Sequence, residues 1–464
     1  MRRRKIVIVG GGSNSWAPDL VKDMMLTPAI ADSEFVLYDI DKSAATLVRQ
    51  YLMKLNEKLK TPATFTASSD LPRAFERAEY IIITISTGGF DAMAHDLAIP
   101  EKYGIFHTVG DTSGPGGWAR LMRNFSVFKK LAEDINRHAP GAMVLNYSNP
   151  MTTLTQILCR ICTGPVVGLC HGLFENLEFL KRLYKLETED QISVRYAGLN
   201  HFFWMTEARI PGMDILADLS RRLEKQTFTD LMRESSPDPK GFHSNRELAT
   251  ELFRLTGVMP YLGDRHTCEF FPQYITSKKN MKKYKLIRTS IKARRNGFNE
   301  RKKNLEKIVA TELPEGNFVK SREAAAEIIS AHVESRSFID VGNVPNIGQI
   351  SNLPLGTIVE TAVCVDRNGF SPIAFGPLPE PVLSFVEPFA RAFNMGVDAC
   401  FEGDRGKALT ALRMDPVCSH LTVDQVLEMG NRLLAAHGPF IKFSATRLKT
   451  NKCEIKETKI LKEP

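Results

Sequence analysis

Residues 5–15 have the sequence Lys-Ile-Val-Ile-Val-Gly-Gly-Gly-Ser-Asn-Ser, in which a short apolar run leads directly into three glycines. A continuous run of apolar, β-branched residues is typical of a strand that is buried on both faces. The glycines predict a tight turn after this strand, and residues 18–26 predict a helix after the turn. The chain therefore opens with a strand, a glycine turn and a helix.

The rest of the first 170 residues repeats this alternation of strands and helices. Apolar runs at residues 34–38, 80–86, 142–146 and 165–169 predict strands, and residues 42–60 predict a long amphipathic helix. Such alternation predicts an α/β fold with a doubly wound, mostly parallel sheet of the Rossmann type.

After residue 172 the alternation fades, and a mixed α+β arrangement is expected. The expected strands lie at residues 193–197 and 358–365, and the expected helical segments lie at 211–246, 246–255, 322–335, 382–402 and 423–436. We therefore predict two domains. Residues 1–172 form a nucleotide-binding domain of the Rossmann type, and residues 173–464 form an α+β domain that serves catalysis, substrate binding and oligomerisation.

Composition excludes several classes of protein. The 464 residues are 43% apolar and 25% charged, as in globular proteins. No stretch approaches the roughly 20 apolar residues of a membrane span, and the N-terminus lacks the pattern of a secretory signal. The eight cysteines lack the spacing of a disulfide framework, which agrees with a reducing compartment. We expect a cytoplasmic protein with no membrane partner.

The net charge of +8 is partly local. Residues 278–303 contain twelve Lys or Arg and a single acid, Glu300. Because interleaved aromatics and a nucleic-acid-binding module are missing, no nucleic-acid partner is expected. The favoured interpretation is a solvated, mobile surface segment, and the alternative is a basic loop that attracts an anionic substrate or cofactor.

The glycine turn has the spacing of a dinucleotide-binding turn. Gly10 and Gly12 match the first two glycines of G-x-G-x-x-G, and Ser15 stands at the third. The two glycines let backbone N–H groups approach a pyrophosphate at the start of a helix. At the end of the second strand, a carboxylate accepts hydrogen bonds from ribose hydroxyls and repels a 2′-phosphate. We therefore predict bound NAD rather than NADP, with the cofactor-binding residues Gly10, Gly12, Ser13, Asn14 and Asp39.

Five later segments concentrate polar and ionisable side chains. They are Gly110–Gly117 with Arg120, Asn146–Met151, Cys170–Gly172, Gly198–Phe202 and Gly263–Phe270. Gly110–Gly117 is expected to place an acid beside a flexible backbone, with an ordinary surface turn as the alternative. A buried cysteine is more often a small apolar residue than a metal ligand, so Cys170 alone does not indicate a metal site. Gly263–Phe270 holds two carboxylates, a guanidinium and an imidazole, which favours acid–base work.

In this order, these segments resemble glycoside hydrolase family 4, the NAD- and metal-dependent glycosidases. The resemblance covers nearly the whole chain and continues through Asn343-Val-Pro-Asn346 and Asn352-Leu-Pro354. It implies a metal ion, usually Mn²⁺, bound by Cys170 and His201. It also implies a reaction in which NAD oxidises the sugar at C3, a base removes the C2 proton, the aglycone is eliminated, water adds at C1, and NADH returns the hydride.

The resemblance also suggests roles for single residues. Asp264 is the expected base, with Tyr261 as a rival, and His171 or Glu175 is the expected acid. Asp111 matches an acid of the same site, and Asn149 matches a residue that contacts the substrate. Family resemblance further implies a homodimer or homotetramer.

The residues after the metal-binding cysteine differ between branches of the family. Cys170-His171-Gly172 resembles the α-glucuronidase branch, so an α-glucuronide is the expected substrate. Planar pairing makes arginine the best partner of a uronate carboxylate, and Arg120 and Arg265 are the candidates. The alternatives are an α-galactosidase or α-glucosidase of the same family, a true NAD-dependent dehydrogenase of the lactate or malate type, and a non-catalytic NAD sensor.

Overall fold

A computed structural model describes residues 3–235, 245–311, 313 and 318–441. Its centre is one 13-stranded sheet with the order β10-β8-β7-β12-β11-β6-β5-β4-β1-β2-β3, in which β13 pairs with β12 and β9 with β8. The parallel half contains β1 (Lys5–Val9), β2 (Glu34–Tyr38), β3 (Thr64–Ser68), β4 (Tyr80–Ile83), β5 (Met143–Asn146) and β6 (Val166–Gly168). The order 6-5-4-1-2-3 is that of a Rossmann sheet, as predicted.

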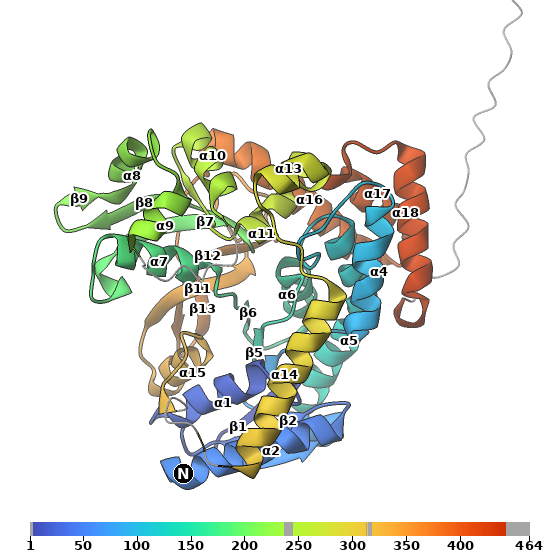
Figure 1. Cartoon of the computed structure of the whole chain (residues 1–464). Helices are drawn as coiled ribbons and strands as arrows, with labels where there is room; N and C mark the ends of the chain where they lie inside the picture. Colours follow the sequence, from blue (N-terminus) through green and yellow to red (C-terminus); the bar gives the residue numbers. More distant parts are fainter. Residues whose placement is uncertain (1–2, 236–244, 312, 314–317, 442–464) are drawn as a thin grey trace, which may run out of the picture.

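Helices connect the parallel strands and cover both faces of this half (Figure 1). They are α1 (Trp16–Met25), α2 (Lys42–Leu59), α3 (Leu71–Phe75), α4 (Gly89–Glu101), α5 (Gly114–His138) and α6 (Met151–Ile161). The start of α2 shows how local sequence fixes these helices, because the Asp41 side chain accepts hydrogen bonds from the backbone N–H groups of Ser43 and Ala44.

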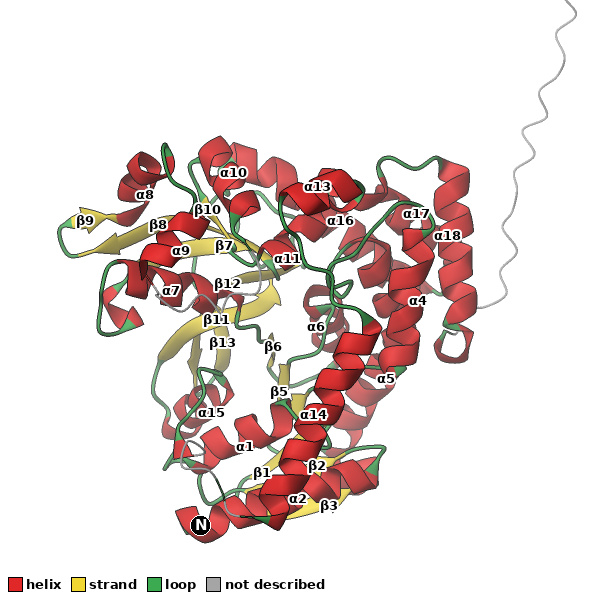
Figure 2. Ribbon diagram, viewed as in Figure 1, coloured by secondary structure: helices red, strands yellow, loops and turns green. Residues whose placement is uncertain are grey.

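The second half extends the same sheet with antiparallel strands (Figure 2). They are β7 (Ser193–Leu199), β8 (Phe202–Ile210), β9 (Met213–Asp214), β10 (Met259–Pro260), β11 (Phe338–Pro345), β12 (Ile358–Asp366) and β13 (Gly369–Pro372). The junction is the pairing of Asn343 in β11 with Gly168 in β6. The sheet therefore continues across the predicted boundary at residue 172, and the two-domain division stays a prediction.

The remaining helices pack around this antiparallel half or bridge back to the first. They are α7 (Gly172–Leu183), α8 (Ile215–Leu223), α9 (Phe228–Ser235), α10 (Glu247–Thr256), α11 (Asp264–Thr267), α12 (Pro272–Ile275), α13 (Lys278–Lys283), α14 (Ile291–Ala310), α15 (Ala325–Glu334), α16 (Glu380–Glu402), α17 (Arg405–Met414) and α18 (Val423–Ala436). None of the described helices combines the length and apolar character that a membrane span requires.

Two segments differ from the sequence-based expectation. The glycines at residues 114–117 do not form a flexible turn, because they are the buried first turn of α5. A Cβ on Gly117 would lie 2.3 Å from the carbonyl oxygen of Thr112, so close packing requires glycine there. The basic residues 278–303 are not a loop either, since most of them belong to α13 and α14.

The glycine turn should be as sensitive to added volume as a core position. A Cβ on Gly11 would lie 2.6 Å from Cα of Leu37 in β2, where the backbone cannot yield. We expect Gly11→Ala to lower the free energy of unfolding by about 1–3 kcal/mol. Urea denaturation measures this change, and Gly297→Ala within α14 is the control.

Gly297 meets only the flexible end of Arg301 at 3.4 Å, so alanine there should be neutral or stabilising by up to about 1 kcal/mol. Equal stability of Gly11→Ala and the wild type would show that the turn is not packed as described.

Candidate active site

The glycine turn is held against the end of β2. The backbone N–H groups of Gly10 and Gly11 both donate to the carbonyl oxygen of Tyr38, at 2.9 and 2.8 Å. A Cβ on Gly12 would lie 2.6 Å from Cβ of Ala44. The turn therefore lies close to β2 and α2, and Ser15, the cap residue of α1, offers that helix no side-chain hydrogen bond. A helix start beside glycines suits a pyrophosphate, although the N–H of Trp16 already donates to Oγ of Ser13 at 3.1 Å.

Asp39 lies beside this turn, as the sequence predicted for a ribose-binding acid. Its Oδ2 accepts from the N–H of Gly12 at 2.9 Å, and its Oδ1 accepts from the N–H of Asp41 at 2.9 Å. A carboxylate has about four acceptor positions, so ribose hydroxyls can still bind. Asn14, another predicted cofactor residue, donates its side-chain N–H to the carbonyl oxygen of Phe298 in α14, at 3.0 Å. These residues fit a bound dinucleotide.

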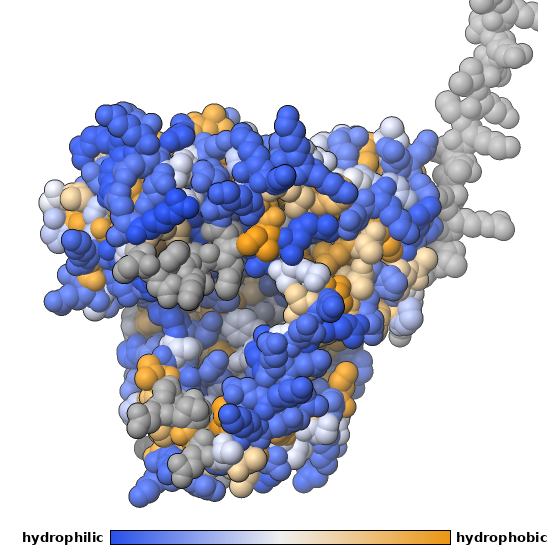
Figure 3. Space-filling model, viewed as in Figure 1, coloured by the Kyte–Doolittle hydropathy of each residue, from blue (hydrophilic) through white to orange (hydrophobic). Residues whose placement is uncertain are grey.

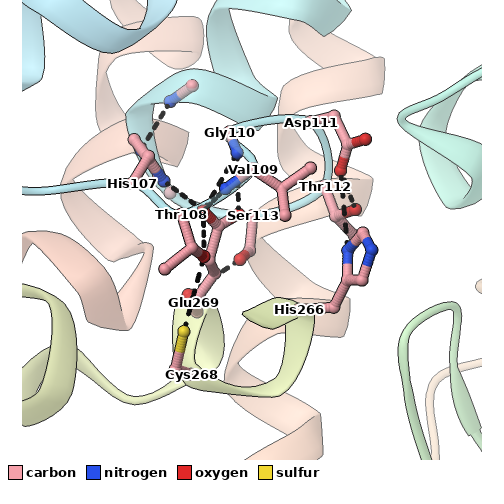
Figure 4. Close-up of polar contacts among 12 residues, drawn as sticks. His107, Thr108, Val109, Gly110, Asp111, Thr112, Ser113, His266, Cys268 and Glu269 are labelled. Atoms are coloured by element: carbon pink, nitrogen blue, oxygen red, sulfur yellow. Dashed lines mark hydrogen bonds and ion pairs between the residues drawn. The ribbon is translucent and has the colours of Figure 1, made fainter. Parts of the chain in front are cut away.

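Three side chains that are distant in sequence, and that come from three different elements, lie close together. Asp111, from the segment before α5, His201, from the turn between β7 and β8, and His266, from α11, each offer one ligand atom. These atoms lie within 4.8 Å of one another. Figure 4 shows Asp111 and Thr112 facing His266. Two imidazoles and a carboxylate at this spacing suit a divalent cation.

The backbone at His201 supports a functional role for this residue. His201 and Asn200 form the two-residue connection between β7 and β8, and His201 has φ of 60°. Glycine or asparagine is the usual residue at such a position, because a side chain there strains the backbone. A residue kept in a strained conformation is a candidate for function, at a cost of about 1–3 kcal/mol.

Thr112 fixes which nitrogen of His201 is free. The Thr112 hydroxyl donates to Oδ1 of Asp111 at 2.9 Å, so its single proton is used. Nδ1 of His201, which lies 2.9 Å from the same hydroxyl, must then donate to it. The lone pair of His201 consequently lies on Nε2. A histidine oriented in this way is prepared to bind a metal ion.

Electrostatics keeps these groups in their metal-binding forms. Burial raises the pKa of Asp111, but His266, Arg120 and His201 outweigh burial and lower it to about 2. Burial, followed by the nearby His266, lowers the pKa of His201 well below its usual value. The site therefore contains an ionised carboxylate and a neutral imidazole at neutral pH.

Cys170 follows β6 and lies outside this group of three. Burial raises the pKa of its thiol, and Asn200, the neighbour of His201, forms a hydrogen bond with it. The ring of Tyr261 lies between the two segments. It stacks on His201 with ring centroids 6.1 Å apart, and a Cβ on Gly172 would be 3.5 Å from it. A bound cation would favour the thiolate that coordination needs, and the hydrogen bond from Asn200 places this thiol next to the turn that carries His201.

A buried carboxylate, Glu269, holds the segment that precedes Asp111. Its oxygens accept from the N–H groups of Val109 and Gly110, at 2.7 and 2.9 Å, and from the Thr108 hydroxyl at 3.0 Å (Figure 4). Nδ1 of His107 lies 3.3 Å away. Burial raises the pKa of Glu269, but His107 and these hydrogen bonds outweigh it, so the net shift is downward and the group stays ionised.

Asp264, the expected base, caps a helix. Its two oxygens accept from the N–H groups of Leu248 and Ala249 at the start of α10, at 3.0 and 3.1 Å, and it is fully buried. Burial raises its pKa to about 7, which suits a base, but a base must first reach its proton. The geometry does not favour this role. His266, two residues later in the same helix, is the side chain that lies beside Asp111 and His201.

The other predicted residues lie as follows. His171 is about half exposed, with Nδ1 3.5 Å from Glu323 and its ring stacked on Trp16. A hydrogen bond to Glu323 raises the pKa of His171. Oδ1 of Asn149 accepts from the N–H of Met151 at 3.1 Å, at the end of β5. Arg265 is committed elsewhere, because its guanidinium donates to the carbonyl oxygen of Ile287 and to the Thr289 hydroxyl.

Comparison with known proteins decides the family. Residues 5–186 match the model of family 4 glycosyl hydrolases, and residues 196–418 match the C-terminal domain of that family. The chain belongs to glycosyl hydrolase family 4. An α-galacturonidase of Bacillus subtilis (strain 168) is 31% identical over 432 residues, which cover 89% of this chain and 93% of that enzyme. An α-galactosidase of the same organism is 29% identical over 449 residues, covering 94% and 99%.

Solved structures agree. The lplD protein of Bacillus subtilis has a TM-score of 0.84 at 29% identity, over 94% of this chain and 100% of that chain. A 6-phospho-α-glucosidase from gut microorganisms, in complex with NAD and Mn²⁺, has a TM-score of 0.80 at 21% identity, over 95% and 100%, and shares the fold. The resemblance drawn from the sequence is therefore confirmed, and the chain is a glycosidase of an NAD-dependent family rather than an ordinary dehydrogenase.

Family 4 membership leaves the roles of single residues as predictions. Sequence reasoning gave no individual role to His266, Glu269 or Thr112, although all three lie in the segments that it singled out. It gave none to Arg294 in α14, which donates to the carbonyl oxygen of Val109 at 3.2 Å. Arg294 lies among many other basic residues, so the sequence did not indicate that its side chain points towards the site.

The orientation of His201 can be tested through Thr112. Thr112→Val removes the hydroxyl that receives the Nδ1 proton, so we expect Mn²⁺ affinity to fall by roughly 10-fold to 100-fold. Isothermal titration with Mn²⁺ measures the change. Thr152→Val is the control, since the buried Thr152 hydroxyl has no hydrogen-bond partner among the described residues. An unchanged affinity in Thr112→Val would contradict the proposed tautomer.

Proposed function

We propose that this family 4 glycosidase hydrolyses α-linked uronides, preferring an α-galacturonide, with NAD and Mn²⁺ as its resident cofactors. The observation that carries the proposal is Arg120. Its guanidinium is buried and electrostatically coupled to Asp111, and its enclosed Nε has no hydrogen-bond partner in the described chain. A C6 carboxylate supplies such a partner. The relatives named α-galacturonidase favour the galacto configuration over the gluco configuration expected from the sequence.

The residues divide between the two cofactors. The turn at residues 10–14 and Asp39 would bind NAD, and Cys170 and His201 would hold the metal ion. When bound, NAD supplies reversible hydride transfer at C3 of the sugar, and the metal supplies Lewis acidity. Asn149 binds the sugar at the carboxyl end of β5, where doubly wound folds bind ligands. Assembly as a homodimer or homotetramer is part of the same proposal.

Proton transfer falls to two histidines. Nδ1 of His266 is enclosed, has no hydrogen-bond partner among the described groups, and lies 3.9 Å from Oδ1 of Asp111. It removes the C2 proton, and the ionised Asp111 stabilises the imidazolium that results. His171, whose proton Glu323 stabilises, donates to the departing aglycone. Asp111, with a pKa of about 2, carries no proton to give at neutral pH.

An α-galactosidase is the second candidate, because relatives with that name match most of the chain. A neutral sugar offers the Arg120 guanidinium no charge. The buried cation would then stay unpaired in the enzyme–substrate complex, which costs free energy. The uronide is therefore the better match to the site.

The activity is tested with the p-nitrophenyl α-glycosides of galacturonate, glucuronate, galactose and glucose. We expect the galacturonide to give the highest kcat/KM, and cleavage to require NAD⁺, Mn²⁺ and a thiol reductant without net formation of NADH. Preference for a neutral glycoside would contradict the substrate. Steady production of NADH from the sugar would contradict the mechanism.

The base is tested with His266→Gln. Loss of the imidazole should lower kcat by roughly 10²-fold to 10⁴-fold, while the affinity for NAD, measured by titration, changes little. Asp264→Asn is the matched comparison in the same helix. It should keep kcat and mainly lower stability, by about 0.5–2 kcal/mol, because a cap is weakened. The reverse pattern would restore Asp264 as the base.

A further inference from the structure

Helix α14 connects the nucleotide turn with the segment that carries Asp111. Near its middle, the carbonyl oxygen of Phe298 accepts from Asn14, and near its end the carbonyl oxygen of Val309 accepts from Lys54 at 3.1 Å. Near its start, the Arg294 guanidinium donates to Val109. In Figure 1 the helix runs from α2 to the level of α4 and α6, and in Figure 3 it forms a hydrophilic ridge beside a hollow in the surface.

Arg294 differs from the other basic residues of this helix. Lys292 and Arg295 are exposed, and Arg295 forms an ion pair with Asp91 at 2.5 Å. Arg294 turns inward, and its enclosed Nε has no hydrogen-bond partner among the described residues. A solvated surface helix has no need of an arginine in that position.

Arg120 in α5 also has a guanidinium nitrogen without a hydrogen-bond partner among the described residues. It is 7% exposed, one terminal nitrogen donates to the Ser86 hydroxyl at 3.4 Å, and its Nε is unpaired in the described structure. Arg123, one turn later and fully buried, forms an ion pair with Asp96 at 2.7 Å. The fold thus supplies a carboxylate to a buried arginine whose role is structural, and it supplies none to Arg120 or Arg294 within the described ranges.

The charges around these two arginines do not balance. Asp111 acts on both guanidinium groups, and Arg120 and Arg265 both act on Arg294. The neighbouring Glu269 is already surrounded by N–H donors and His107. Glu269 also acts on Arg294, but its oxygens already accept from Thr108, Val109 and Gly110, so Asp111 is left to face both inward guanidinium groups. The site has a surplus of positive charge before the substrate enters.

We infer that Arg294 and Arg120 together form the binding site for the C6 carboxylate of the substrate, so that Arg294 of α14 determines specificity for charged over neutral glycosides. The inference rests on the proposed uronidase function and adds a residue to it. Guanidinium groups bind a carboxylate through paired, charge-assisted hydrogen bonds. A neutral glycoside, with a hydroxymethyl group at C6, would enclose both guanidinium groups without a counter-charge. The unpaired cations would make its complex less favourable than that of the uronide.

The test compares Arg294→Met with Arg295→Met. Methionine keeps the apolar length of the side chain and removes the charge, and Arg295 is the adjacent exposed arginine. We expect Arg294→Met to lower kcat/KM for p-nitrophenyl α-galacturonide by roughly 10-fold to 100-fold, mainly through KM. The dissociation constant of free D-galacturonate, measured by titration, should rise in parallel. Arg295→Met should match the wild type in both.

Two further measurements separate this role from others. Activity on p-nitrophenyl α-galactoside and affinity for NAD should stay within a few-fold of wild type in Arg294→Met, which also shows that the variant is folded. Equal losses on both glycosides would overturn the inference in favour of a structural role. Weaker NAD binding with unchanged galacturonate binding would overturn it in favour of a nucleotide contact.

Failure of the proposed function is distinguishable from failure of this inference. A wild-type enzyme that prefers galactoside, and binds D-galactose as tightly as D-galacturonate, refutes both before any variant is made. A wild type that prefers the galacturonide, combined with an Arg294→Met variant that keeps this preference, refutes the role of Arg294 alone.

Discussion

The site depends on the burial of one ionised carboxylate, that of Glu269. An ion removed from water is costly unless hydrogen bonds replace its hydration. Here the replacement comes from Thr108, Val109 and Gly110, so the segment before α5 is held against the segment after α11. The two segments are about 160 residues apart in the chain. This carboxylate therefore helps to bring Asp111 and His266 together, along with the Ser113 hydroxyl, which donates to the backbone carbonyl oxygen of Glu269 at 2.8 Å.

The same connection sets the chemistry of neighbouring groups. It places Asp111 beside two imidazoles and a guanidinium, which keep it ionised. It places Thr112 between Asp111 and His201, which fixes the tautomer of the histidine. The strained backbone at His201 is compatible with a stable fold because β7 and β8 are paired on both sides of the turn. Support from strands thus allows a residue that local preference would exclude.

Local patterns predicted the parallel half of the fold well. β1 and β2 were predicted with the bounds that the structure shows, because a buried apolar run and a glycine turn are encoded in adjacent residues. The glycines of α5 were misinterpreted, since a need for close packing against Thr112 leaves the same trace in a sequence as a need for flexibility. In the site, Asp111 and His201 were singled out through family resemblance. The approach of His266 to both is a property of the tertiary fold and has no local signature.

Arg294 shows where charge patterns mislead. The twelve basic residues among residues 278–303 predict a solvated surface, and most side chains of α14 are indeed exposed. The charge pattern does not indicate that one of these basic side chains, that of Arg294, turns inward. The enclosed Nε of Arg294, which has no hydrogen-bond partner among the described residues, marks that position only in three dimensions. A protein can carry an unpaired buried cation if the complex that it forms with its substrate is the state in which the charge is neutralised. The unpaired state weakens the free enzyme, and the paired state strengthens binding of the correct ligand relative to a neutral analogue. Specificity for a charged sugar therefore follows from an interaction that the fold leaves incomplete.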